Sequence, residues 1–239
     1  EGMTRPVVLT QAGWCEGQLV QDGDVQSALF SLPEIPAKGY ATFPLADAAC
    51  LEEGLSLVKE DTTAGMLTVS SQLLETRFFR ITLDKKGEFV SVYDKQVERE
   101  VLASGEKGNA LLAFEDRPMQ YDNWDIDMFY TEKCWPVDDL ASATVLENGP
   151  VRGTLRLVRR FAESIITQDI RIYRDIPRVD FKTHVEWQQS QILLKVAFPV
   201  DIRTERATYE IQFGHVERPT HWNTSWDWAR FEVCGHRWA

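Results

Sequence analysis

Residues 178–187 read RVDFKTHVEW, and this stretch decides the fold class. Charged or polar side chains alternate in it with mainly apolar ones. The two sets are Arg178, Asp180, Lys182, His184 and Glu186, and Val179, Phe181, Thr183, Val185 and Trp187. Because successive side chains of a β-strand point to opposite faces, the stretch predicts a strand with one buried and one solvated face.

The segments on both sides of this strand continue the β pattern. The strand is the third of a meander predicted over 151–187. The turn 84–87 ends in Gly87, which suits a positive φ angle in a hairpin. Further strands are predicted at 77–83, 89–93, 109–114, 192–200 and 209–213. Since no helical period is sustained, we predict an all-β chain in which residues 67–239 form the first part of a large antiparallel supersandwich.

The N-terminal quarter has a shorter β pattern. Turn residues, including Asp22, Gly23 and Asp24, separate brief apolar runs. The predicted strands are 6–10, 18–20, 25–32 and 40–45. We therefore predict a small β-sandwich domain over residues 1–66, with its boundary to the second domain near 63–66. Both ends of the sequence also resemble cuts within a longer polypeptide, and we expect an excised fragment.

Composition excludes several classes of function. The chain has 239 residues and a formal net charge of −11, whereas nucleic acids and anionic membrane surfaces require a basic footprint. No apolar run is long enough to span a bilayer. The cysteines Cys15, Cys50, Cys134 and Cys234 show no paired spacing, which favours free thiols and a reducing, cytoplasmic environment.

Residues 213–239, FGHVERPTHWNTSWDWARFEVCGHRWA, combine four tryptophans with three of the four histidines of the chain. Aromatic rings beside polar groups are suited to sugar binding, because sugar C–H faces stack on rings while amides and carboxylates bind hydroxyls. The candidates for a cleft or a domain interface are His221, Asn223, Trp226 and Asp227. A structural role is the competing interpretation, with Asp227 bonded to backbone or to Arg230 and alternate residues of 228–233 packed between sheets.

The segment 115–127 contains five carboxylates, Glu115, Asp116, Asp122, Asp125 and Asp127, around Trp124. A loop over 117–123 could bring them together. One interpretation is the carboxylate pair of a glycosidase. The other is a solvated rim loop, since acidic clusters are common in an acidic protein. The spacing lacks the glycine and glutamate of an EF-hand, and Cys234 with His236 is only half of a zinc site.

Three stretches resemble motifs of one enzyme family. RPTHWNTSWDWARFEVCGHRWA (218–239) resembles RPTH-x-NTSWD-x-A-x-FEVC-x-H-x-WA in the C-terminal β region of glycoside hydrolase family 38, the α-mannosidases. GNALLAFEDRPMQYDNWDIDMFY (108–130) and EWQQSQILLKVAFP (186–199) resemble two further segments of that region. The resemblance covers about residues 67–239 and implies a supersandwich of the galactose-mutarotase-like type.

The resemblance also implies where the chemistry is performed. In the family, the nucleophilic Asp and the ligands of a zinc or other divalent ion belong to an N-terminal catalytic domain. We therefore expect no catalytic residue and no metal site here. The β region would form one wall of the cleft and contact an α-mannoside through Tyr121, Asp122, Trp124 and Asp125, unless these residues only pack against another domain.

The expected function is thus the non-catalytic β region of a retaining, metal-dependent α-mannosidase, inactive by itself. Its partners would be an α-mannoside or oligosaccharide, the catalytic domain and, in the complete enzyme, further copies in a homo-oligomer. Gln189 and Gln191 depart from the family's Glu and His, which removes any acid, base or ion-pair role there. The alternatives are an autonomous carbohydrate-binding module and a purely structural or oligomerisation domain.

Overall fold

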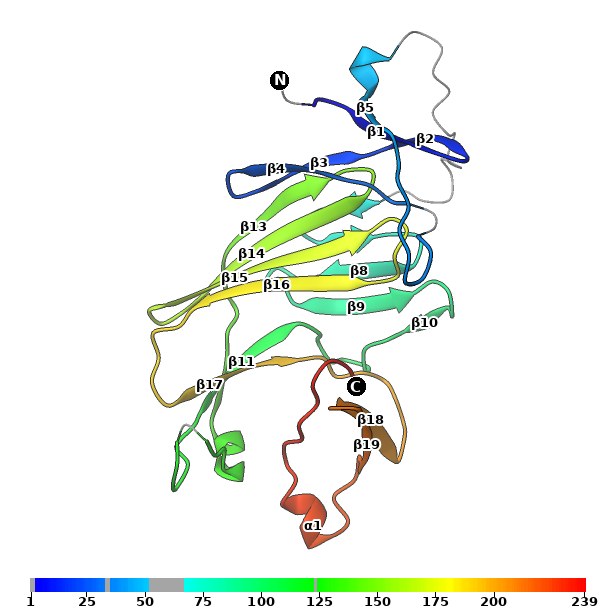
Figure 1. Ribbon diagram of the computed structural model, residues 1–239. Helices are drawn as coiled ribbons and strands as arrows, with labels where there is room; N and C mark the ends of the chain where they lie inside the picture. Colours follow the sequence, from blue (N-terminus) through cyan, green and yellow to red (C-terminus); the bar gives the residue numbers. More distant parts are fainter. Residues whose placement is uncertain (1–2, 33–34, 52–66, 123) are drawn as a thin grey trace.

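The computed structural model describes residues 3–32, 35–51, 67–122 and 124–239. In these ranges the chain is almost entirely antiparallel β-structure, which confirms the predicted fold class (Figure 1). Helical structure in them is confined to the 3-10 turns η1 (Ala48–Cys50) and η2 (Met128–Glu132) and the helix α1 (Ser225–Trp228). The domain boundary predicted at 63–66 lies outside the described residues.

Four long strands form the first layer of the sandwich. They have the order β13-β14-β15-β16, with bounds β13 (Asp139–Asn148), β14 (Arg152–Phe161), β15 (Ser164–Tyr173) and β16 (Val179–Glu186). The predicted meander is therefore confirmed and begins one strand earlier than expected. The sequence pattern did not predict β13, because its apolar residues do not alternate regularly with polar ones. Its pairing with β14 also shifts register twice.

The second layer consists of two sheets. One has the order β10-β9-β8-β7-β6, with β6 (Thr68–Val69), β7 (Leu73–Glu75), β8 (Phe79–Leu83), β9 (Phe89–Asp94) and β10 (Arg99–Glu100). The other has the order β12-β11-β17, with β11 (Ala110–Glu115), β12 (Cys134–Pro136) and β17 (Ile192–Ala197). Isolated bridges between Phe89 and Gly108 and between Leu102 and Val200 connect them. The hairpin β18 (Arg206–Ile211) and β19 (Gly214–Pro219) follows.

The core lies between the two layers. One apolar cluster joins Leu74, Ile81 and Phe89 of the five-stranded sheet to Leu155 and Ile170 of the first layer. A second cluster joins the three-stranded sheet to the other part of the first layer, with Leu111, Ala113, Val137 and Ile166 at its centre. The alternation of apolar and polar side chains gives each layer one apolar face, and the other layer covers that face.

Polar residues are also part of this core. Arg159 of β14 is only 1% exposed and donates a hydrogen bond of 2.7 Å to the carbonyl oxygen of Gly87. Gly87 has the positive φ angle of 75° that the turn pattern predicts. A Cβ atom there would lie 2.9 Å from Leu157 and 3.0 Å from the Arg159 guanidinium. The turn therefore requires glycine both for its conformation and for the approach of Arg159.

The edge strand β16 differs from the prediction in one respect. Phe181 packs against Phe89 and Phe198 with ring centroids 5.9 and 5.5 Å away, so the expected face does point to the other layer. However, Phe181 and Val185 remain 36% and 38% exposed. The reason is that β16 pairs only with β15 and lies at the margin of the packed layers.

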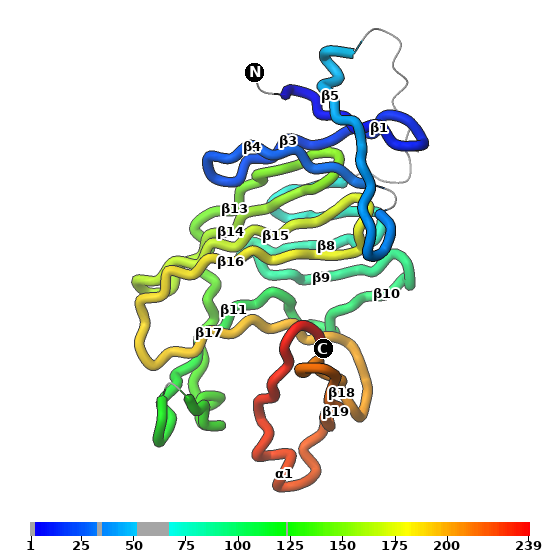
Figure 2. Tube along the Cα trace, in the orientation of Figure 1, coloured from blue at the N-terminus to red at the C-terminus, as the bar shows by residue number. Residues whose placement is uncertain are grey.

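In the N-terminal part, β1 (Pro6–Thr10), β2 (Gly13–Glu16) and β5 (Leu45–Asp47) form a sheet of order β2-β1-β5. β3 (Gln18–Asp22) and β4 (Val25–Leu29) form a hairpin (Figure 2), and Asp22 accepts a hydrogen bond of 3.2 Å from Lys182 of β16. The strand predicted at 40–45 was wrong over 40–44, and β5 begins only at Leu45. Pro44 lacks an N–H and contributes only a carbonyl, which accepts from Leu9 at 3.0 Å.

Gln18 connects this part to the sandwich. Its side-chain oxygen accepts from the backbone N–H groups of Val151 and Arg152 at 3.0 and 2.7 Å, and its amide donates to the Arg152 carbonyl at 2.9 Å. Gln18 is 6% exposed, so these bonds lie in a largely water-free contact. One side chain thereby satisfies three backbone groups at the start of β14.

We expect Gln18→Leu to lower the free energy of unfolding by about 1–3 kcal/mol, because it leaves buried backbone groups without partners. Urea unfolding followed by fluorescence measures the change. Gln21→Leu is the matched control, since the exposed Gln21 amide donates to the carbonyl of nearby Gly23 at 2.7 Å. Equal losses in the two variants would contradict the role assigned to Gln18.

Candidate functional site

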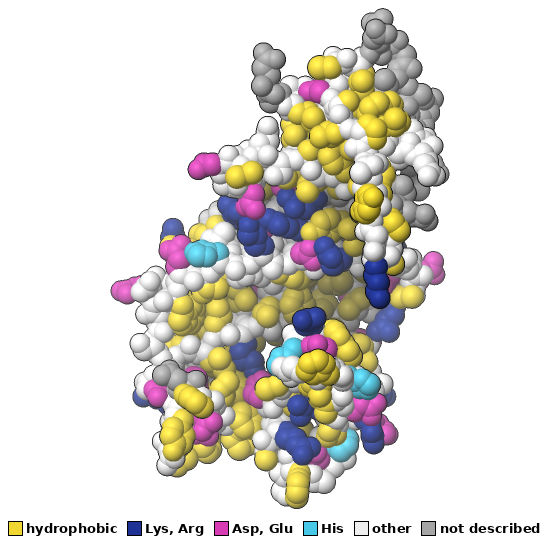
Figure 3. Space-filling model, viewed as in Figure 1, with side chains coloured by type: hydrophobic (Ala, Val, Ile, Leu, Met, Phe, Trp, Pro, Cys, Tyr) yellow, Lys and Arg dark blue, Asp and Glu magenta, His cyan; other side chains and the backbone are white. Residues whose placement is uncertain are grey.

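Two irregular segments project from the same end of the sandwich, below β11 and β17 in Figures 1 and 2. One is the loop between β11 and η2, here named the 116–127 loop and described except for Asn123. The other contains β18, β19 and α1. These segments carry the two groups of site residues predicted from the sequence. In Figure 3 this end shows apolar side chains interspersed with acidic, basic and histidine side chains.

The 116–127 loop exposes the residues predicted to contact substrate. Tyr121 has a φ angle of 57°, and its carbonyl accepts hydrogen bonds from the backbone N–H groups of Trp124 and Asp125 at 2.6 and 2.9 Å. This tight turn places Tyr121, Asp122, Trp124 and Asp125 within one short segment. Tyr121 and Trp124 are 69% and 90% exposed, so the turn presents both rings to solvent.

Hydrogen bonds close the base of the loop. The Asp127 carboxylate accepts from the backbone N–H of Met119 at 2.7 Å, which joins the two sides of the loop. The N–H of Asp116 donates to the Gln191 carbonyl at 2.8 Å, next to the start of β17. The exposed rings are therefore attached to a segment with defined backbone contacts at its base.

Asp116 is the electrostatically unusual carboxylate of the loop. Burial raises its pKa, and the negative charges of Asp122 and Asp127 raise it further. One of its carboxylate oxygens is buried without a hydrogen-bond partner. The loop thus brings three of the five predicted carboxylates close enough to influence one another.

Behind the loop, three polar side chains meet from distant parts of the sequence. The Tyr130 hydroxyl of η2 donates to the Glu232 carboxylate, and Lys195 of β17 donates to the Tyr130 oxygen at 2.8 Å. Lys195 also forms an ion pair with Glu232. We name these residues the Tyr130–Lys195–Glu232 cluster. It joins all three stretches that carried the sequence resemblance.

The second predicted group lies around α1. Thr224 caps this helix in a capping box: its hydroxyl accepts from the Asp227 N–H at 3.2 Å, while the Asp227 carboxylate accepts from the Thr224 N–H at 3.0 Å. Asp227 is 8% exposed, and His221 Nδ1 lies 3.6 Å from its carboxylate. The backbone role predicted for Asp227 is confirmed. The packing of alternate residues over 228–233 was wrong, because α1 ends in this segment and no strand follows through 239.

Aromatic rings around α1 remain open to solvent. Trp222, Trp226 and Trp228 are 56%, 73% and 51% exposed. Trp222 and Trp228 cover one another in part, with ring centroids 5.4 Å apart. Asn223 is also exposed. The Tyr130–Lys195–Glu232 cluster connects the segment that carries this aromatic group to the segment that follows the 116–127 loop. A hollow of about 310 Å³ lies beside it and is lined by Arg117, Asp127 and Tyr130, among others.

Sequence reasoning missed Tyr130, Lys195 and Glu232 as a unit. The available signal was Lys195, a single charge within the apolar run ILLKVA. The Gln189 amide donates to the Ser164 hydroxyl at 3.3 Å, whereas Gln191 is exposed and its backbone carbonyl accepts from the Asp116 N–H at the base of the loop. Among the described residues, no three His, Cys, Asp or Glu side chains are grouped to hold a metal ion.

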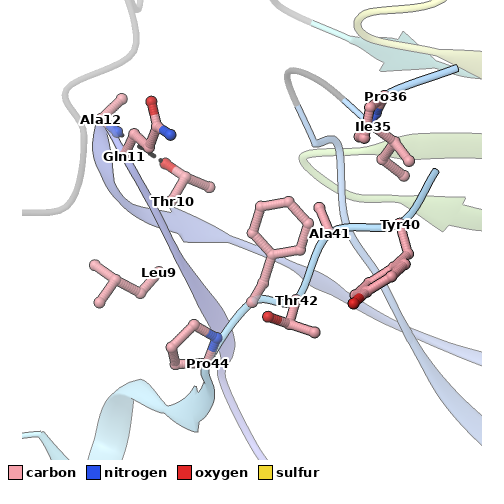
Figure 4. A pocket seen from close by; sticks show the side chains of 11 residues that line it. Leu9, Thr10, Gln11, Ala12, Ile35, Pro36, Tyr40, Ala41, Thr42 and Pro44 are labelled. Carbon is pink, nitrogen blue, oxygen red and sulfur yellow. Dashed lines mark hydrogen bonds between the residues drawn. The ribbon is translucent and has the colours of Figure 1, made fainter.

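Another hollow of the described surface lies away from this end. It has a volume of about 980 Å³ and occurs in the N-terminal part, at the opposite end from α1. Leu9, Ile35 and Tyr40 contribute apolar walls, and Thr10 and Gln11 contribute polar atoms (Figure 4). Among the described residues that line it none is charged, so they offer neither an acid nor a base for hydrolytic chemistry.

Fold and site together define an all-β region with exposed aromatic and acidic loops at one end. The C-terminal domain of the glycosyl hydrolases family 38 matches residues 74–239. Human alpha-mannosidase 2C1 is 36% identical over 213 residues, which is 87% of this chain and 20% of that protein. Alpha-mannosidase G of Dictyostelium discoideum is 41% identical over 175 residues, which is 70% of this chain and 16% of that protein.

The chain belongs to glycosyl hydrolase family 38, and its residues 74–239 match the C-terminal domain of that family. It spans about a fifth of the length of the curated relatives that it matches. The crystal structure of an alpha-mannosidase from Enterococcus faecalis V583 has the same fold, with a TM-score of 0.68 over 95% of this chain and 30% of that one at 14% sequence identity.

We expect Asp116→Asn to stabilise the protein slightly at pH 7, by less than about 1 kcal/mol, because it removes a partly screened charge between two carboxylates. Because the pKa of Asp116 is higher in the folded state than in the unfolded state, the folded protein loses stability as the pH rises from the pKa of the unfolded state through that of the folded state. The gain should therefore disappear near pH 3, where Asp116 is protonated. Urea unfolding at the two pH values measures this difference, and a gain independent of pH would contradict the explanation.

Proposed function

We propose that this chain is the non-catalytic β region of a retaining, metal-dependent α-mannosidase and forms one wall of the cleft that binds a terminal α-mannosyl group. The proposal rests mainly on the 116–127 loop. Trp124 is almost fully exposed on this loop, and a hydrogen bond from the Met119 N–H to the Asp127 carboxylate closes the base of the loop. An indole that is exposed to water lacks the favourable free energy of burial that it gains when a ligand or another domain covers it. Membership of family 38 and the names of the relatives support a mannoside as that ligand.

Within this proposal the loop residues have separate tasks. Trp124 and Tyr121 offer ring faces to the apolar side of a sugar, and Asp122 and Asp125 accept hydrogen bonds from its hydroxyl groups. His221, Asn223 and Trp226 line the margin of the cleft or its interface with the catalytic part. Asp227 supports them indirectly through the helix cap.

The nucleophile and the zinc or other divalent ion belong, in this proposal, to a separate catalytic domain. The described residues do not fit such an ion: His221 and Asp227 make only a pair, and Asp227 is already engaged by Thr224. We therefore assign no chemical step to this chain. Its contribution is to bind and orient the sugar and to exclude water from one side.

A packing role has its own support. Several large apolar side chains are exposed to solvent by about one-third or more. They are Phe181, Val196, Phe198, Ile202 and Phe213. Exposed apolar area of this kind is typical of a surface that contacts another domain or another copy. Sedimentation of the chain distinguishes this candidate: self-association that rises with concentration, without a response to mannosides, would favour it.

A cytoplasmic location is part of the proposal. The four cysteines are free, and three of them are exposed. Exposed unpaired thiols are compatible with a reducing compartment and would be prone to oxidation outside it.

We expect the chain alone to show no hydrolysis of an aryl α-mannoside above the buffer rate, with or without added zinc. The physical reason is that the proposed nucleophile is not among its residues, so no glycosyl-enzyme intermediate can form. Release of the aryl group measures the reaction. Turnover that grows with protein concentration and survives repeated purification would refute the assignment of catalysis to another domain.

In a complete family 38 enzyme containing this chain, we expect Trp124→Ala to raise KM for an α-mannoside about tenfold, through loss of roughly 1.4 kcal/mol of contact energy. Steady-state kinetics give the ratio. Tyr40→Ala is the control, because Tyr40 is 86% exposed but lines the N-terminal hollow with Leu9 and Thr10 and is not part of the 116–127 loop. Unchanged kinetics in Trp124→Ala would remove the loop from the cleft.

A further inference from the structure

The Tyr130–Lys195–Glu232 cluster lies directly behind the 116–127 loop. Asp127, the last residue of the loop, is the N-cap of η2, and its carbonyl accepts from the Tyr130 N–H at 3.1 Å. The Asp127 carboxylate in turn binds the Met119 N–H across the loop. Any displacement of Tyr130 is therefore transmitted through Asp127 to both sides of the loop that carries Trp124.

Tyr130 is buried and contacts neighbouring side chains on several sides, although it lies beside a surface loop. It is 7% exposed, and its ring meets Phe114 edge-on at 5.2 Å and Phe231 at 6.3 Å. The Lys195 ammonium lies 4.7 Å from the ring centroid. The hydroxyl is the only polar group of this side chain, and both of its partners are charged groups from other segments.

Both charged partners stay ionised at neutral pH. Burial raises the pKa of Glu232, but hydrogen bonds from Lys195 and Tyr130 outweigh it and the pKa is lowered overall. Burial lowers the pKa of Lys195, but its bonds to Glu232 and Tyr130 raise the pKa overall. Hydrogen bonds to charged groups are stronger than neutral ones, especially where water is limited. The cluster is therefore a strong connection between β17, η2 and the segment after α1.

We propose that Tyr130 is a positioning residue: clamped by Lys195 and Glu232, it fixes the 116–127 loop relative to the segment that carries α1. The geometry thereby couples the two groups of exposed residues at this end of the sandwich. The positioning itself is a property of this chain. Only its kinetic consequence rests on the proposed function.

Hydrogen exchange of the full 239-residue chain, followed by mass spectrometry, tests the positioning. Tyr130→Phe keeps the ring and its packing and removes only the hydroxyl. We expect amides in peptides covering 116–127 to exchange about tenfold faster, because loss of a hydrogen bond to charged groups favours local opening. Tyr173→Phe is the matched control, since the Tyr173 hydroxyl bonds Asp180 at 2.6 Å on the other layer.

Two more variants separate positioning from general destabilisation. Lys195→Met retains a long apolar side chain and removes the charge, and we expect it to accelerate exchange in 116–127 as Tyr130→Phe does. Glu232→Gln retains an oxygen acceptor for the Tyr130 hydroxyl, so exchange should lie between that of the wild type and that of Tyr130→Phe. Unchanged exchange in 116–127 for both Tyr130→Phe and Lys195→Met, or equal acceleration in Tyr173→Phe, would overturn the proposal.

Kinetics in a complete family 38 enzyme distinguish this inference from the proposed function. If both hold, Tyr130→Phe should raise KM for an α-mannoside several-fold, with a smaller change in kcat, and Glu232→Gln should restore part of the difference. Faster exchange in 116–127 with unaltered KM supports the positioning and refutes the proposed cleft wall. Altered KM without any change in exchange refutes the positioning and leaves the cleft wall standing.

Discussion

The structure depends on the need to cover the apolar face of β14 and β15. Leu155, Leu157, Ile166 and Ile170 of these strands are fully buried, and such a face is stable only against a second layer. The five-stranded and three-stranded sheets supply that layer together, joined by two isolated bridges. A single continuous face of the first layer therefore sets the positions of two sheets that come from separate parts of the sequence.

Burial of Arg159 constrains how these layers meet. Its guanidinium lies among apolar residues, where burial lowers its pKa while Glu88 and Asp84 oppose that change. A buried charge is costly unless it is paired and hydrogen-bonded. The Gly87 carbonyl satisfies part of this requirement, so the turn between β8 and β9 must remain close to β14. Nearby, Asn109 and Gln168 exchange reciprocal amide bonds of 2.8 and 3.1 Å between β15 and the start of β11.

This arrangement also determines where the 116–127 loop emerges. β11 pairs with β17 from Ala110 opposite Ala197 to Glu115 opposite Ile192. The end of β11 and the start of β17 therefore lie at the same edge of the sheet, and the 116–127 loop begins next to Gln191. Lys195 is the fourth residue of β17 and contacts both Tyr130 and Glu232.

Family membership gives these features a common context. Residues 74–239 match the C-terminal domain of an enzyme family, and the chain spans about a fifth of the length of the relatives that it matches. Large exposed aromatic and apolar side chains are unfavourable in an isolated unit but are appropriate for a surface shared with another domain and a ligand. The acidic net charge is compatible with a neutral sugar, which requires hydroxyl-binding groups and ring faces more than charge complementarity.

The sequence by itself determined the fold class, most strand positions, the Gly87 turn and the family, because these follow from alternation, turn chemistry and contiguous motifs. Only the tertiary structure decided that Arg159 occupies an inward position of β14, that 225–228 is a helix and that Tyr130, Lys195 and Glu232 meet. The physical reason is range. Alternation is set by neighbours along the chain, whereas a contact across 65 or 102 residues exists only once two sheets have packed and their register is fixed.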